Sequence, residues 1–144
     1  MKLGKYSIGI GDRFSHQGEA QLAAIMKAKS ELGIDISPVW NKSNREHTYV
    51  HTVPEDTRKE ADAAVKVLGF KGEYFVDADH INLNNVDKFL SSSNFFTLDV
   101  ADYIGKSATD AEISKFLADH KKFVGTLTIP GISHPFEITA DYIE

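Results

Sequence analysis

Three titratable side chains crowd the end of one apolar run near the middle of the sequence. Residues 74–76 are Tyr, Phe and Val, which favour a buried β-strand, and Asp77, Asp79 and His80 follow at once. In proteins of alternating strands and helices, ligands bind at the carboxyl ends of parallel strands. Carboxylates and an imidazole at that place can hold a divalent metal and leave one carboxylate free as a base. The structural alternative is that an Asp caps the next helix and His80 hydrogen-bonds a carbonyl.

An early turn carries a second pair of charged side chains. Residues 9–14 are Gly-Ile-Gly-Asp-Arg-Phe and follow a predicted strand. A dinucleotide fingerprint would need a third glycine at a fixed spacing, which is missing, so a tight turn that presents Asp12 and Arg13 is favoured. The guanidinium of Arg13 suits a substrate carboxylate or phosphate. An ion pair with Asp12 or another acid is an equally good interpretation.

A polar segment at residues 41–47 follows the second predicted strand. We interpret it as a loop in which Asn44 and Arg45 hold the hydroxyls and a carboxylate of a substrate, with a solvated loop as the alternative. His47 and His51 stand four apart, which is a metal-ligand spacing on a helix. Residues 48–53 favour extended backbone, however, so the sequence does not predict a metal pair there.

Composition narrows the class of protein. The chain has 144 residues, a net charge of -5 and no cysteine. Without a basic stripe, nucleic acid is not an expected partner. The lack of cysteine excludes disulfides and thiolate sites, so a metal must be held by His, Asp and Glu, which suits Zn, Mn, Ni, Co or Fe. With no signal peptide and no apolar run of the roughly 20 residues that span a bilayer, we expect a cytoplasmic protein without a membrane partner.

Hydrophobic periodicity predicts strands and helices in alternation. The predicted strands are residues 6–10, 34–40, 74–76 and 94–100, and the predicted helices are residues 17–32, 54–68, 85–90 and 109–119. These make four β-α units over residues 1–121, followed by an irregular extension over residues 122–144. We treat residues 1–144 as a single α/β unit.

Four β-α units with a parallel sheet form either a small doubly wound domain or half of an eight-unit barrel. Polar groups follow every predicted strand, and the chain ends in the first turn of a predicted helix. Both features favour the N-terminal half of a TIM-like barrel that belongs to a longer protein. The alternative is a doubly wound domain that binds a ligand or a cation without catalysis, in which Asp12, Asp77 and Asp99 surround Mg²⁺.

The turn at residues 9–14 and the Phe-Val-Asp-Ala-Asp-His-Ile motif at residues 75–81 together resemble the tagaturonate epimerase family. The resemblance extends from about residue 6 to residue 105. It implies a metal-dependent barrel enzyme of hexuronate breakdown that interconverts D-tagaturonate and D-fructuronate, which are sugar acids. Members of the family are much longer, so the resemblance also implies that this chain is an N-terminal portion and is inactive alone.

The resemblance assigns roles to individual residues. His80 would be a metal ligand, Asp79 the acid/base and Asp77 a group that orients the site. Arg13, with Asp12 beside it, would bind the substrate carboxylate. The two sugar acids differ at C4 while the ketone is at C2, so a retro-aldol route through the C4 hydroxyl is the hypothesis for the reaction. The other metal ligands would lie after residue 144, and the unpaired edges of a half barrel would allow homo-oligomers.

Overall fold

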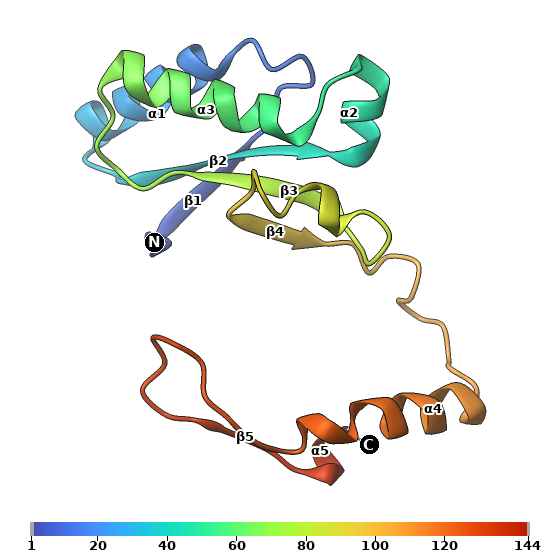
Figure 1. The fold of residues 1–144 in the computed structure, drawn as a ribbon. Helices are drawn as coiled ribbons and strands as arrows, with labels where there is room; N and C mark the ends of the chain where they lie inside the picture. The colour runs from blue at the N-terminus through green and yellow to red at the C-terminus, as the bar shows by residue number, and fades with distance from the viewer. Residues whose placement is uncertain (1, 144) are drawn as a thin grey trace. The chain divides into compact units, whose positions relative to one another are not determined.

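The computed structural model describes residues 2–143, which form two compact units, Met1–Asp102 and Tyr103–Glu144 (Figure 1). The first unit alternates strands and helices along the chain. Its elements are β1 Tyr6–Ile10, α1 Gly18–Leu32, β2 Ile36–Ser43, α2 Asn44–Val50, α3 Pro54–Leu68, β3 Phe75–Ile81, the 3-10 helix η1 Val86–Lys88 and β4 Phe95–Leu98.

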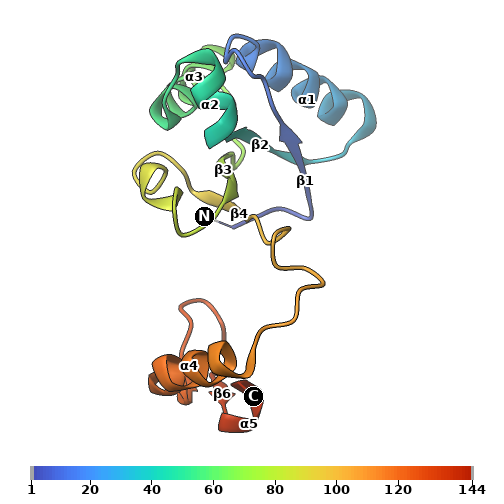
Figure 2. The same cartoon turned by 90° about the vertical axis from the view of Figure 1, so that its right-hand side faces the viewer.

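The four strands of the first unit form one parallel sheet in the order β1-β2-β3-β4. Helices α1 and α3 lie on the same face of this sheet, as both views show (Figures 1 and 2). A doubly wound sheet needs a reversal of strand order and helices on both faces. Within the described residues, the doubly wound alternative is therefore wrong. The arrangement is that of the first four units of a β/α barrel, which confirms the predicted fold class.

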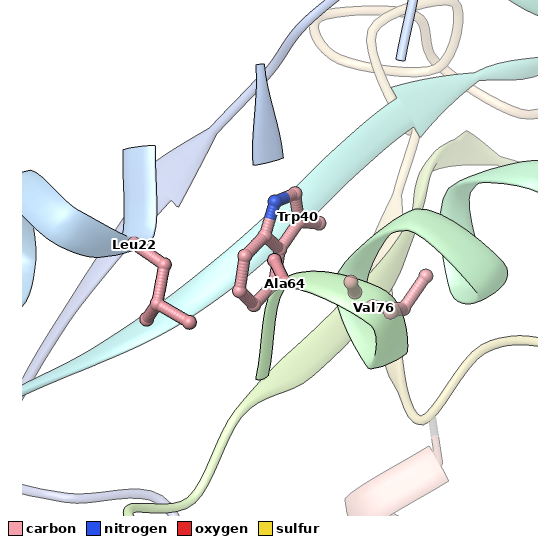
Figure 3. Packing of buried hydrophobic residues seen from close by; sticks show 5 residues of the cluster. Leu22, Trp40, Ala64 and Val76 are labelled. Carbon is pink, nitrogen blue, oxygen red and sulfur yellow. The ribbon is translucent and has the colours of Figure 1, made fainter. Parts of the chain in front are cut away.

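The main core lies between the sheet and the two long helices. Leu22 of α1, Ala61 and Ala64 of α3, and Trp40 and Val76 of β2 and β3 are all at most 2% exposed and form one cluster (Figure 3). The small alanines allow α3 to approach the sheet closely enough to contact the large Trp40 ring. Because successive side chains of a strand point to opposite faces, the residues that follow Trp40 and Val76 face away from the helices.

The end of β2 differs from the prediction. The strand continues to Ser43, and the segment predicted as a loop and then extended backbone is helix α2. A capping box explains the helix: the Ser43 hydroxyl accepts from the backbone N–H of Glu46, and the Glu46 carboxylate accepts from the backbone N–H of Ser43. This local hydrogen bonding outweighs the weak preference of Thr48 and Val50 for extended backbone.

The second unit is built from short elements. They are α4 Asp110–His120, the 3-10 helix η2 Lys121–Phe123, strands β5 Gly125–Leu127 and β6 Phe136–Ile138, which pair antiparallel, and α5 Ala140–Ile143. The predicted irregular extension therefore contains a β-hairpin, because a turn that includes Pro130 and Gly131 brings two extended segments together. The prediction of one domain over residues 1–144 stays a prediction. In residues 2–143, no helix has the length and apolar character needed to cross a membrane.

Candidate active site

A β-bulge interrupts β3 at the predicted catalytic motif. Between Ala78 and Ile81, the register of β3 with β4 shifts by one residue, so Asp79 and His80 lie inside the bulge. His80 has a φ of 56°, a left-handed backbone conformation that a side chain makes costly. Ala78 and Ile81 both pack in a second small core cluster. In an unbroken strand, residues three apart point to opposite faces, so the bulge is what brings these two side chains to the same face. Strained backbone of this kind is typical of functional sites.

The bulge brings two neighbouring side chains into contact. His80 Nδ1 lies 2.8 Å from Asp79 Oδ1. A carboxylate only accepts hydrogen bonds, so Nδ1 carries the proton and Nε2 of a neutral ring keeps a free lone pair. The His80 side chain is 63% exposed, whereas that of Asp79 is 14% exposed. A carboxylate behind an exposed imidazole is the usual arrangement of a metal-binding histidine.

A polar pocket of about 300 Å³ opens beside His80, at the carboxyl ends of β2, β3 and β4. Its lining comprises Ser43, Asn44, Arg45, His80, Asn82, Asn85 and Asp99. The structure thus brings the predicted residues Asn44 and Arg45 together with His80. Arg45 is exposed and forms no ion pair within 4.0 Å among residues 2–143. The pocket therefore offers an unpaired guanidinium, amide groups and an imidazole to a ligand.

The early turn has a structural function in this unit. The Asp12 carboxylate accepts hydrogen bonds from the backbone N–H groups of Phe14, His16 and Gln17, at 3.0, 2.6 and 2.8 Å. Burial raises the pKa of this carboxyl, but the three backbone hydrogen bonds outweigh burial and hold the pKa below its usual range. Asp12 thereby shapes the start of α1, and it does not line the pocket.

Arg13, predicted to bind the substrate carboxylate, also lies outside the lining of the pocket. Its Nε lies 3.7 Å from Glu46 Oε1, and its side chain is 59% exposed. Arg13 thus has a weak surface ion pair.

Asp77 faces away from the helices and contacts β4. It is 5% exposed, and its Oδ2 accepts a hydrogen bond of 2.8 Å from the Thr97 hydroxyl. Among residues 2–143, its Oδ1 is buried without a hydrogen-bond partner, as is Oδ1 of Asn41, which pairs with Asp77 in the sheet register. Burial raises the pKa of the Asp77 carboxyl. It is Asp79, one residue from His80, that contacts the imidazole.

Replacing Asp77 with asparagine is expected to stabilise the first unit by about 1–2 kcal/mol at neutral pH, because it removes a buried charge with an unpartnered oxygen. The stability that protonated Asp77 contributes is fully present below the unfolded pKa of about 3.9 and is lost as pH rises through the raised folded pKa. The stabilisation by Asp77→Asn should therefore disappear in acid, where Asp77 is protonated and carries no buried charge. Urea unfolding followed by Trp40 fluorescence measures it, with the exposed Asp87→Asn as control. A loss of stability at neutral pH would contradict this account.

His47 is a core residue of the first unit. It is 4% exposed, its Nδ1 lies 2.9 Å from the Thr52 hydroxyl, and its ring packs against Phe89. Burial, with the charge of Lys42 nearby, lowers the pKa of the imidazole to about 4. His51 forms the left-handed cap that ends α2. The extended backbone predicted for this segment is wrong over α2, and the two histidines have separate roles, one as a core residue and one as a helix cap.

The side chains at the bulge can supply one ligand to a metal ion. Among residues 2–143, no three His, Asp or Glu side chains are grouped so that they could hold a metal ion. The predicted cluster of Asp12, Asp77 and Asp99 is therefore not formed. A catalytic metal usually has about three protein ligands, and His80 with Asp79 behind it supplies one of them.

The sequence did not indicate three of the pocket residues as site residues: Ser43, Asn82 and Asn85. Asn82 and Asn85 come directly after the motif, where the three asparagines among residues 82–85 indicated only the start of a helix. Asp99 was named only in the Mg²⁺ alternative, with Asp12 and Asp77, and the structure places it in the pocket with His80. The sequence feature that could have indicated Asn82 and Asn85 is the group of asparagines directly after the Asp-Ala-Asp-His motif.

Comparisons with known proteins agree with the fold. The sequence profile of the tagaturonate epimerase family, UxaE, matches residues 1–128. A search of curated proteins found no match. Two crystal structures of fructuronate-tagaturonate epimerase from Cohnella laeviribosi, one native and one with two glycerols, are similar in fold at 20% sequence identity and a TM-score of 0.61. The match covers 96–99% of this chain but only 30–31% of those chains, so this chain spans about a third of their length. The chain belongs to the tagaturonate epimerase family.

Proposed function

We propose that this chain supplies part of the active site of an enzyme that interconverts D-tagaturonate and D-fructuronate by epimerisation at C4, with a divalent cation (Mn, Ni, Zn, Co or Fe) as cofactor. The observation that carries the proposal is the 2.8 Å contact of Asp79 with His80, held in a strained bulge beside a polar pocket. Membership of the family supports the choice of substrate class.

His80 is the proposed metal ligand, through Nε2. A divalent cation held there would polarise oxygen atoms of the substrate and stabilise negative charge that develops on them. Asp79 fixes the ring so that Nε2 is the nitrogen without a proton. The described residues offer no group of three ligands, so we propose that the site is completed by side chains outside residues 2–143 and that the chain alone has no epimerase activity.

Asp79 is the proposed acid/base. Its Oδ1 contacts His80, and its Oδ2 has no hydrogen-bond partner among residues 2–143. Oδ2 can therefore accept the proton of the C4 hydroxyl. The electron pair of the O–H bond forms the C=O of an aldehyde at C4 as the C3–C4 bond breaks. The electrons of the C3–C4 bond pass into the fragment that carries the ketone. Rotation of the aldehyde and re-addition on its other face invert C4, and Asp79 returns the proton.

Arg45 is the better placed of the two predicted arginines to bind the substrate carboxylate. It lines the pocket and is unpaired among the described residues, whereas Arg13 lies near Glu46. Asn44 lies beside it in the pocket, and its Oδ1 accepts from Lys88 Nζ at 3.1 Å, which leaves its amide N–H₂ for a hydroxyl. Arg13 and Asp12, predicted to contact the same substrate, do not line this pocket, so we assign the substrate carboxylate to Arg45 alone.

Calorimetric titration of the chain with D-tagaturonate in the presence of Zn²⁺ tests this assignment. Arg45→Ala is expected to weaken binding by about tenfold or more, since it removes a charge-assisted hydrogen bond. Arg13→Ala is the matched control and should change binding little. The neutral sugar D-tagatose, which lacks the carboxylate, should bind unmodified protein as weakly as D-tagaturonate binds Arg45→Ala. Equal binding of the two sugars by the unmodified chain would contradict the proposed function.

Two further properties belong to the proposal. A cytoplasmic setting is part of the proposal, and a chain without cysteine is compatible with a reducing compartment. Self-association is supported by the sheet order, because β1 and β4 each have one neighbour among the described strands and keep an unpaired edge.

A further inference from the structure

The Asn85 side chain hydrogen-bonds to the backbone on both sides of Ile81, the residue that follows the bulge. Its Oδ1 accepts a hydrogen bond of 2.9 Å from the backbone N–H of Asn82, and its Nδ2 donates a longer one of 3.4 Å to the carbonyl of His80. Ile81, between these two residues, is 3% exposed and packs with Ala78 in the core. Asn85 therefore closes a small loop whose first residue is His80.

The backbone at the first residue of this loop is strained. His80 adopts φ 56°, a conformation that costs roughly 1–2 kcal/mol for a residue with a side chain unless its surroundings hold it. Two restraints act on His80 from opposite ends: Asp79 holds its ring at Nδ1, and Asn85 holds its backbone carbonyl. The ring is largely exposed, so packing does little to orient it.

We infer that Asn85 is a positioning residue that holds the His80 backbone in its left-handed conformation and so keeps the His80 ring on Asp79 with Nε2 free to bind a metal. Without the Asn85 amide, His80 can relax to negative φ, and its ring leaves the Asp79 carboxylate. The free imidazole then favours the tautomer with the proton on Nε2, which blocks the ligating nitrogen. The metal part of this inference rests on the proposed function.

Three variants separate positioning from general stability. Asn85→Ala removes both hydrogen bonds. Asn85→Asp keeps the acceptor for the Asn82 N–H and loses the donor to the His80 carbonyl, but it also adds a negative charge to the pocket, so it is used for the tautomer readout alone. Asn84→Ala is the matched control, because Asn84 is an exposed neighbour of the same type whose side chain forms no hydrogen bond among residues 2–143. Fluorescence of Trp40 verifies that each variant is folded.

The first readout needs no metal. In protein labelled with ¹⁵N-histidine, the His80 signals, assigned with His80→Ala, should report mainly the tautomer protonated at Nδ1. Asn85→Ala and Asn85→Asp should both shift the majority to the tautomer protonated at Nε2, and Asn84→Ala should not. An unchanged tautomer in folded Asn85→Ala and Asn85→Asp would overturn the inference.

The second readout is Zn²⁺ affinity by calorimetry. Asn85→Ala should bind Zn²⁺ about tenfold more weakly than the unmodified chain, the size of effect typical of groups that orient a metal ligand. If the tautomer shifts but His80→Ala leaves Zn²⁺ binding unchanged, the positioning role stands and the proposed metal function fails. If His80→Ala abolishes binding while Asn85→Ala keeps full affinity and both Asn85 variants keep the original tautomer, the positioning role fails and the metal function stands.

Discussion

Replacing His80 with alanine is expected to weaken Zn²⁺ binding to the chain by about 100-fold or more. Loss of a group that merely orients a ligand costs 10–100-fold, and loss of the ligand itself should cost at least as much. The bulge presents the exposed imidazole with the Asp79 carboxylate behind Nδ1, so the unprotonated Nε2 is the one histidine nitrogen at the pocket arranged for a metal. Calorimetry with Zn²⁺ alone measures the change.

The matched control for this prediction is His51→Ala. His51 is also exposed and also has φ 56°, but it caps α2 and does not line the pocket. The backbone strain left behind is therefore similar in the two variants. Equal loss of Zn²⁺ affinity in both would indicate unspecific binding to surface histidines and would contradict the site.

The first unit is expected to lose about 3 kcal/mol of stability from His47 alone as pH falls from about 6.5 to about 4. Burial lowers the folded-state pKa of His47 to about 4, whereas the unfolded value is about 6.5. Between these values the unfolded chain binds the proton more readily than the folded one. Stability from neutral His47 is thus fully present above about pH 6.5 and lost on the way down to about pH 4.

His47→Gln removes this titration while keeping a neutral polar group near Thr52. As pH falls through that window, the unmodified chain should steadily lose free energy of unfolding through His47. His47→Gln should not lose this contribution, so it should become more stable relative to the unmodified chain. Urea unfolding followed by fluorescence measures it, because Trp40 is the only tryptophan and lies in the core of this unit. The exposed His134→Gln is the control. Parallel stability curves for the unmodified chain and His47→Gln would refute the buried, neutral state of His47.

Much of the architecture follows from local sequence pattern. Helix α1 was predicted from apolar residues at helical spacing, and Gly33, which follows it in the sequence, forms the left-handed cap. The apolar run before Asp77 became the central strand β3, because a strand buried on both faces is almost continuously apolar. These signals act over a few residues and need no tertiary information.

The parts that could not be predicted depend on contacts between distant segments. Helix α2 forms where β2 ends, and β2 extends to Ser43 because it pairs with β3 as far as Asp79. The bulge depends on the register between β3 and β4, which a single strand's sequence does not contain. Without the bulge, Asp79 and His80 would point to opposite faces, so the sequence could nominate both residues but not their contact.

The most direct measurement is anomalous X-ray diffraction at the zinc absorption edge, from crystals of the chain grown with Zn²⁺. The account predicts an anomalous peak in the pocket formed by Asn44, Arg45 and His80, at about 2.1 Å from His80 Nε2, with Asp79 still in contact with Nδ1. A peak only at other histidines, or an imidazole that has left Asp79 and binds no zinc, would contradict the central claim that this strained bulge presents a metal ligand.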